Sequence, residues 1–123
     1  MSDKYYLGGE DGRTPIHTNS LEEWAQKFET ENRRVALDEF SYFDENSKHR
    51  TIRISTVFLG LDHNWSVHGI GEPLLFETMV FATSIPEFDQ TMDRCSTWEQ
   101  VEAQHKAAVE QAEKLINTLN GEW

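Results

Sequence analysis

The stretch that decides the fold is "TIRISTVFLGLDHNWSVHGIGEPLLFETMVFA", residues 51–82. β-Branched and aromatic residues dominate both of its ends, which predicts one strand over 51–61 and another over 74–82. Alternation along the first strand places one set of side chains on a single side of the sheet: Ile52, Ile54, Thr56 and Phe58. About 12 residues join the two strands, too few for a crossover helix, so the pair is expected to be antiparallel.

Further strands are expected on the N-terminal side of this pair. The segment 33–43 is rich in β-branched and aromatic residues, and the polar turn 44–50 connects it to the strand over 51–61. Near the start of the chain, "KYYL", "GGEDGR" and "TPIHT" indicate a short hairpin with a glycine-containing turn. After the last of the three central strands, the segment 83–95 is expected to be a loop.

Two helices complete the predicted fold. A helix over 21–31 follows Ser20, which forms a capping box with Glu23. The C-terminal helix is expected to begin with a second capping box, Ser96 with Glu99, and to stop at Asn120–Gly121. Its apolar stripe recurs at helical spacing: Trp98, Val101, His105, Ala108, Val109, Ala112, Leu115, Ile116 and Leu119.

The resulting fold class is α+β, in a single domain over 1–123. An N-terminal hairpin and a short helix precede an antiparallel three-stranded meander, and the long C-terminal helix packs on one face of that sheet. With 123 residues, the chain is long enough for one modest core.

The net charge of the chain favours some classes of binding partner over others. The chain has 22 acidic and 11 basic residues, a formal net charge of −11. This charge opposes binding to nucleic acid or to an anionic membrane surface, and it suits a protein with a basic surface. No apolar run approaches the roughly 18 residues of a membrane span. The N-terminus lacks the apolar core of a signal peptide, so a cytoplasmic location is expected.

Four segments taken together resemble a known group of proteins: "EEWAQKFETENRRVA", "STVFLGLDHNW", "PLLFETMVF" and "STWEQVEAQHKAAV". In this order they are similar to small proteins of no established activity that recur in phage and prophage genomes. The resemblance extends from about residue 4 to residue 110 and implies a phage or prophage origin in a bacterial host, without implying an activity.

The loop between the central strands admits a chemical interpretation. Asp62, His63 and His68 lie in it, and Glu77 lies in the following strand. Two imidazoles and two carboxylates are enough ligands for a first-row metal ion. The sequence therefore leaves open a metal-binding module or a metal-dependent enzyme centred on residues 62–77.

A structural interpretation of the same residues is favoured. Asp62, just past a strand end, can accept hydrogen bonds from loop amides, and His63 can bond to the backbone across the turn. Trp65 can cover the end of the sheet. Glu77 can face solvent or meet a base such as Arg53 on the adjacent strand.

Two further candidate residues are interpreted as structural. His105 lies in the apolar stripe and is interpreted as a satisfied core or boundary residue. Cys95, the only cysteine, is either a half-buried structural side chain, which is favoured, or a reactive thiol before a helix start. The chain carries no recognisable catalytic or phosphate-binding motif, so neither an enzyme nor a cofactor is expected.

The function predicted from sequence is that of a small acidic accessory protein that binds another protein. Its specific form would be inhibition of a host nucleic-acid-handling protein that has a basic groove; a homodimer is also considered. The residues expected to contact the partner are Trp65, His68, Glu99, Glu102, Glu110 and Glu113.

Overall fold

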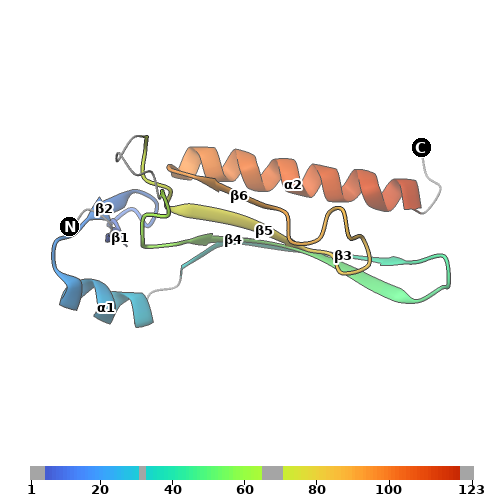
Figure 1. Ribbon diagram of the computed structural model, residues 1–123, viewed down its shortest axis with the longest axis horizontal. Helices are drawn as coiled ribbons and strands as arrows, with labels where there is room; N and C mark the ends of the chain where they lie inside the picture. Colours follow the sequence, from blue (N-terminus) through green and yellow to red (C-terminus); the bar gives the residue numbers. More distant parts are fainter. Residues whose placement is uncertain (1–4, 31–32, 65–70, 120–123) are drawn as a thin grey trace.

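The computed structural model describes residues 5–30, 33–64 and 71–119. Eight elements follow one another along the chain (Figure 1). They are β1 (Tyr6–Gly8), β2 (Pro15–His17), α1 (Leu21–Thr30), β3 (Arg34–Phe43), β4 (His49–Phe58), β5 (Phe76–Phe81), β6 (Met92–Cys95) and α2 (Trp98–Leu119). The predicted α+β class is confirmed, with an N-terminal hairpin, a short helix, an antiparallel sheet and a long C-terminal helix.

The main sheet is an antiparallel meander with strand order β3-β4-β5-β6. The predicted pairing of the two central strands is confirmed, with Ile54 opposite Val80 and Phe58 opposite Phe76. The fourth strand is a correction, because Met92–Cys95 falls inside the segment expected to be a loop. β6 is short and polar, and it is held at the sheet edge through its backbone pairing with β5, so its sequence lacks an alternating apolar pattern.

β4 ends earlier than predicted, at Phe58 rather than at residue 61. Gly60 has a φ of +72°, a left-handed conformation that L side chains rarely adopt and that interrupts an extended strand. The backbone carbonyl of Gly60 accepts two hydrogen bonds, from the Tyr6 amide at 3.0 Å and from Trp24 Nε1 at 2.7 Å. This turn therefore attaches the β1–β2 hairpin and α1 to the end of the main sheet.

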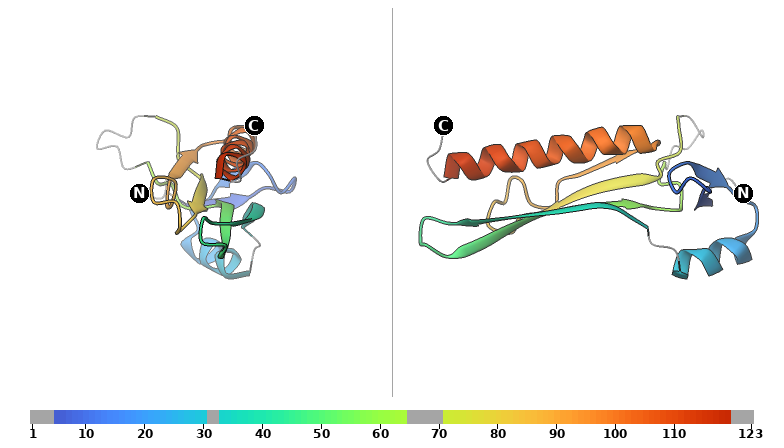
Figure 2. Two further views of the ribbon diagram at one scale, coloured as in Figure 1. Left: turned by 90° about the vertical axis from the view of Figure 1, so that its right-hand side faces the viewer. Right: turned by 180° about the vertical axis from the view of Figure 1, so that it is seen from behind.

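α2 runs along one face of the sheet and forms the second layer (Figures 1 and 2). The predicted inward row of β4 is confirmed, since all four side chains are buried: Ile52, Ile54, Thr56 and Phe58. One core cluster gathers around Ile52 and Ile54, with Ala112 contributed by the helix. A second cluster, around Phe58 and Phe76, receives Val101 from the first turns of α2. The core is thus a single layer of side chains between the sheet and the helix.

The helix cap predicted for α1 is confirmed, and the cap predicted for α2 is wrong by one residue. At α1, the Ser20 hydroxyl accepts a hydrogen bond from the Glu23 amide at 3.1 Å, as expected. At α2, the cap lies one residue later than predicted: the Thr97 hydroxyl accepts a bond from the Gln100 amide, and Gln100 Oε1 accepts bonds from the Ser96 and Thr97 amides. Ser96 with Glu99 and Thr97 with Gln100 both have capping-box spacing. The cap forms at Thr97 because the pairing of β6 with β5 extends through Cys95, so the helix begins after it.

Among the described residues, no helix combines the length and apolar character that a bilayer crossing requires.

Candidate functional site

Asp62 has the structural role that the sequence favoured. Its Oδ1 accepts hydrogen bonds from the amides of Asn64 and Leu74, each at 2.8 Å. The first bond forms an Asx turn, and the second connects the two ends of the loop that joins β4 to β5. The His63 amide also donates to the Leu74 carbonyl at 3.0 Å. Asp62 therefore closes the base of this loop.

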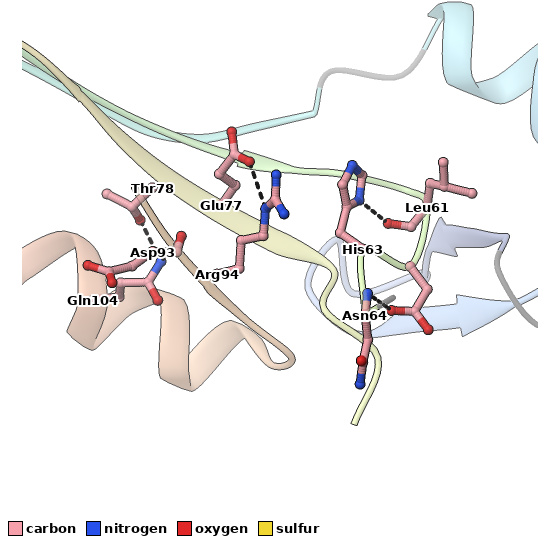
Figure 3. Close-up of polar contacts among 9 residues, drawn as sticks. Leu61, His63, Asn64, Glu77, Thr78, Asp93, Arg94 and Gln104 are labelled. Atoms are coloured by element: carbon pink, nitrogen blue, oxygen red, sulfur yellow. Dashed lines mark hydrogen bonds and ion pairs between the residues drawn. The ribbon is translucent and has the colours of Figure 1, made fainter. Parts of the chain in front are cut away.

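His63 and Glu77 turn to different partners (Figure 3). The ring Nδ1 of His63 bonds to the Leu61 carbonyl at 2.7 Å, and because a carbonyl only accepts, Nδ1 carries the proton. Glu77 accepts an ion-paired hydrogen bond from Arg94 Nε on β6 at 3.0 Å. The partner of Glu77 is therefore Arg94 and not Arg53, which lies 3.6 Å from Glu39 instead.

The proposed metal ligands are not gathered within the described chain. No group of three His, Cys, Asp or Glu side chains suitable for a metal ion occurs in residues 5–30, 33–64 and 71–119. His68 and Trp65 lie outside the described residues, so their predicted contributions to a metal site or to a partner contact stay predictions.

The predicted contact residues of α2 lie on its outer side. Glu99, Glu102, Glu110 and Glu113 are all exposed. Two exposed lysines interrupt this row: Lys106 lies four residues from both Glu102 and Glu110, and Lys114 lies four residues after Glu110. Side chains at this spacing are neighbours on a helix surface. The outer face of α2 is therefore only moderately acidic.

In the part of the chain that the structure describes, no helix lies over the opposite face of the sheet (Figure 2). The strand register places one row on this face across all four strands: Leu37, Ser55, Met79 and Met92. Phe81 and Met92 are each 42% exposed here, and Phe43 is 63% exposed near the β3–β4 turn. The charged side chains on this face pair with one another, as Arg53 with Glu39 and Arg94 with Glu77. We call this surface the uncovered sheet face.

A chain of polar side chains crosses the layer between sheet and helix. Gln104 Nε2 donates to the Thr78 hydroxyl at 3.0 Å, and the Thr78 and Thr56 hydroxyls lie 2.7 Å apart. Thr56 Oγ1 is 2.7 Å from His105 Nδ1, and His105 Nε2 is 2.7 Å from Asp38 Oδ2. One direction satisfies every group: each hydroxyl donates to the next member, and the imidazole Nε2–H donates to the carboxylate.

This chain confirms that His105 is a satisfied boundary residue. A carboxylate, an imidazole and a hydroxyl in hydrogen-bonded order also resemble the parts of a nucleophilic site. Thr56, however, is 0% exposed, so no substrate reaches its hydroxyl. The arrangement instead pairs polar groups in a layer where an unpaired one would be costly.

Sequence reasoning missed the partners of His105. Asp38 lies on β3 and Thr78 on β5, far from His105 along the chain. One signal was present, because Thr56 is the polar residue among the four buried side chains of β4. Its partners follow only from strand register and from the placement of the helix.

Cys95 matches the structural interpretation. Burial is the largest cause that raises the pKa of its thiol, and the nearby charge of Asp93 raises that pKa as well, whereas a hydrogen bond with the Thr97 backbone opposes the shift. A raised pKa leaves less of the reactive thiolate at neutral pH.

The described chain is thus an α+β protein with a four-stranded antiparallel sheet, one helix-covered face and one uncovered face. Comparison with protein-family models, with curated proteins and with solved structures finds no match.

Proposed function

We propose that this chain is a small non-enzymatic accessory protein, of phage or prophage origin, that acts by binding another protein. The observation that carries the proposal is the uncovered sheet face. A sheet that buries only one face usually presents polar side chains on the other. Here the solvent side keeps Met79, Phe81 and Met92 next to one another in the strand register.

Two properties make this face suitable for a partner. Apolar and aromatic side chains at the centre of an interface supply most of its binding energy. The four charged residues on the face are already paired as Arg53–Glu39 and Arg94–Glu77, so covering them leaves no charge without a partner. The uncovered sheet face can therefore be buried at low electrostatic cost.

The net charge of −11 supports a partner with a basic surface. Long-range attraction raises the association rate and weakens as salt screens it. Inhibition of a nucleic-acid-handling protein through its basic groove is the specific form of the proposal. In that form the exposed glutamates of α2 steer the encounter, and the uncovered sheet face makes the lasting contact.

The test compares two pairs of substitutions in capture from a bacterial host lysate. Phe81→Ser with Met92→Ser removes apolar side chains from the uncovered sheet face. Leu21→Ser with Leu119→Ser removes similarly exposed side chains from the two helices and is the matched control. We expect the first pair to weaken binding of the captured protein at least about tenfold, because interface anchors contribute about 2 kcal/mol or more each. The control pair should bind normally.

Retention of the same partner at unchanged affinity by the Phe81→Ser, Met92→Ser chain would contradict the proposal. Light scattering at several protein concentrations checks the homodimer as the alternative occupant of this face. A dimer that dissociates on the same two substitutions would place self-association there in place of a second protein.

A further inference from the structure

A cavity of about 230 Å³ lies on the helix-covered side of the sheet, between α2 and the loop that joins β5 to β6. Its walls come from the inward faces of β5 and β6, from that loop and from one side of α2 (Figure 1). The residues of β5 that line it, Thr78 and Val80, are both buried and point toward the helix layer. We call this space the β5–α2 cavity.

The loop wall of the β5–α2 cavity is held in place by hydrogen bonds to β5. The Gln90 amide donates to the Val80 carbonyl at 2.7 Å, and the Val80 amide donates to the Thr91 carbonyl at 3.0 Å. Asp89 Oδ1 accepts from the Ala82 amide at 2.8 Å. The loop is therefore fixed without a ligand, and a ligand that enters the cavity has little ordering of the chain to offset.

Two carboxylates at the cavity are available to a ligand. Glu87 and Asp93 both line it and both are exposed. Asp93 lies opposite Thr78 in the strand register, which places it on the inward face of β6. Within the described residues, neither carboxylate makes a hydrogen bond or an ion pair, and no basic side chain lines the cavity. The cavity therefore presents negative charge that the chain itself does not balance.

Gln104 adds a third acceptor, and its orientation is fixed. Its Nε2 donates to the Thr78 hydroxyl at 3.0 Å and to the backbone carbonyl of Asp93 at 2.9 Å (Figure 3). Because a carbonyl only accepts, the amide nitrogen and not the oxygen must face Asp93. Gln104 Oε1 then has no partner in the described chain and remains an acceptor at the cavity that Gln104 lines.

The rest of the lining is mainly apolar. Val80 and Phe88 are each 3% exposed, and α2 contributes the small side chains of Ala107 and Ala108. Ordinary ligand pockets measure about 300–1,000 Å³, so this cavity is too small for a nucleotide-sized molecule. It matches one charged group attached to a short methylene chain.

An organic cation fits these acceptors better than a metal ion. No group of three His, Cys, Asp or Glu side chains suited to a metal occurs in the described part of the chain. Calcium, the usual partner of carboxylates, takes six to eight oxygen ligands. A guanidinium instead offers five N–H donors spread in a plane, has no acceptor, and loses less hydration than an ammonium when it is partly buried.

We propose that the β5–α2 cavity binds an alkylguanidinium group. The guanidinium pairs with Asp93 and Glu87 and donates to Gln104 Oε1, and the alkyl chain lies against Val80 and Phe88. The ligand is either a free guanidino compound or the side chain of an arginine in a protein. This site does not depend on the proposed function, because the uncovered sheet face lies on the other side of the sheet.

The experiment titrates the full chain with butylguanidinium, butylammonium and butylurea, and follows the backbone amide signals of Thr91, Asp93 and Gln104 by NMR. Butylurea has nearly the shape of butylguanidinium and lacks its charge. We expect butylguanidinium to bind with a dissociation constant of about 1 mM or below. Butylurea should bind at least about tenfold more weakly, because its hydrogen bonds are not charge-assisted, and butylammonium should fall between the two.

Four substitutions at exposed positions locate the binding site without disturbing the core. Asp93→Asn and Glu87→Gln should each weaken butylguanidinium binding about tenfold, because each removes a charged partner. Ala107→Leu fills the cavity without changing its charge and should weaken binding at least as much. Glu45→Gln removes the same charge from the β3–β4 turn, far from the cavity, and is the matched control that should bind normally.

Several outcomes would overturn the proposal. They are butylurea or butylammonium binding as tightly as butylguanidinium, an equal loss in the Glu45→Gln chain, and no saturable binding below about 10 mM. N-acetylarginine methylamide distinguishes the two sources of the group. Affinity close to that of butylguanidinium supports an arginine side chain of a protein as the ligand, and much weaker affinity supports a free guanidino compound.

Discussion

At the scale of single residues, the Thr56 side chain explains how His105 is accommodated beside an apolar core. Thr56 is fully buried and bonds to both Thr78 and His105, each at 2.7 Å. Sequence periodicity places Thr56 and His105 on inward faces and predicts that His105 is satisfied. It does not identify Asp38 or Thr78, because hydrogen-bond partners on different strands depend on register and not on local sequence.

The contribution of this polar chain can be measured with one isosteric substitution. Thr56→Val keeps the β-branched shape, leaves His105 Nδ1 without a partner and leaves the Thr78 hydroxyl with Gln104 alone. We expect the free energy of unfolding to fall by about 1–3 kcal/mol. Urea unfolding measures it. The control is Thr51→Val on the same strand, whose side chain is exposed and should change stability by less than about 0.5 kcal/mol. Equal losses in the two chains would refute a special role for Thr56.

At the scale of elements, the start of α2 shows how neighbouring structure chooses between two local signals. Ser96 with Glu99 and Thr97 with Gln100 have the same capping-box spacing. β6 extends to Cys95, and the helix then begins at Trp98 with Thr97 as its cap. Residues 83–95 are predicted from sequence to be a loop, and a loop gives no reason to place the helix cap at Thr97 instead of Ser96. Because β6 was not predicted, Arg94 on that strand was not predicted as the partner of Glu77 either.

The cap assignment gives a direct comparison of two adjacent residues. Thr97→Ala removes the hydroxyl that accepts from the Gln100 amide, and we expect it to lower the free energy of unfolding by about 1 kcal/mol. Ser96→Ala should have a much smaller effect, since Ser96 contributes its backbone amide to the cap. Chemical denaturation of both chains measures the difference. A larger loss in Ser96→Ala would favour the cap predicted from sequence.

At the scale of the whole molecule, Gly60 connects the N-terminal unit to the main sheet. Its carbonyl accepts from Trp24 Nε1 of α1 and from the Tyr6 amide of β1. Trp24 also stacks between aromatic neighbours, with ring centres 5.0 Å from Tyr5 and 4.7 Å from Phe28. This attachment holds the hairpin at the end of the main sheet where α2 begins.

Removal of the indole N–H tests the attachment. Trp24→Phe keeps an aromatic ring and loses the bond to Gly60, so we expect hydrogen exchange in β1, β2 and α1 to quicken by roughly two- to tenfold, the effect of about 0.5–1.5 kcal/mol. Amides in β4 and β5 should exchange as before. Trp98→Phe is the matched control, because its indole N–H has no partner in the described chain to lose. Uniform acceleration across all strands would mean that the two parts open together.

Except for β6, the sequence by itself determined the classes of element and the inward faces, since side-chain alternation and helical spacing depend only on neighbouring residues. It also determined the structural role of Asp62, because an Asx turn forms within a few residues. The tertiary structure decided the pairing of β6, the partners of Glu77 and His105, the exposure of one sheet face and the position of Arg13 over the Trp98 ring. The physical reason is that each of these features joins residues that are distant in the chain. Their contacts form only once the strands are paired in register, α2 is packed on the sheet and the N-terminal hairpin is attached to its end.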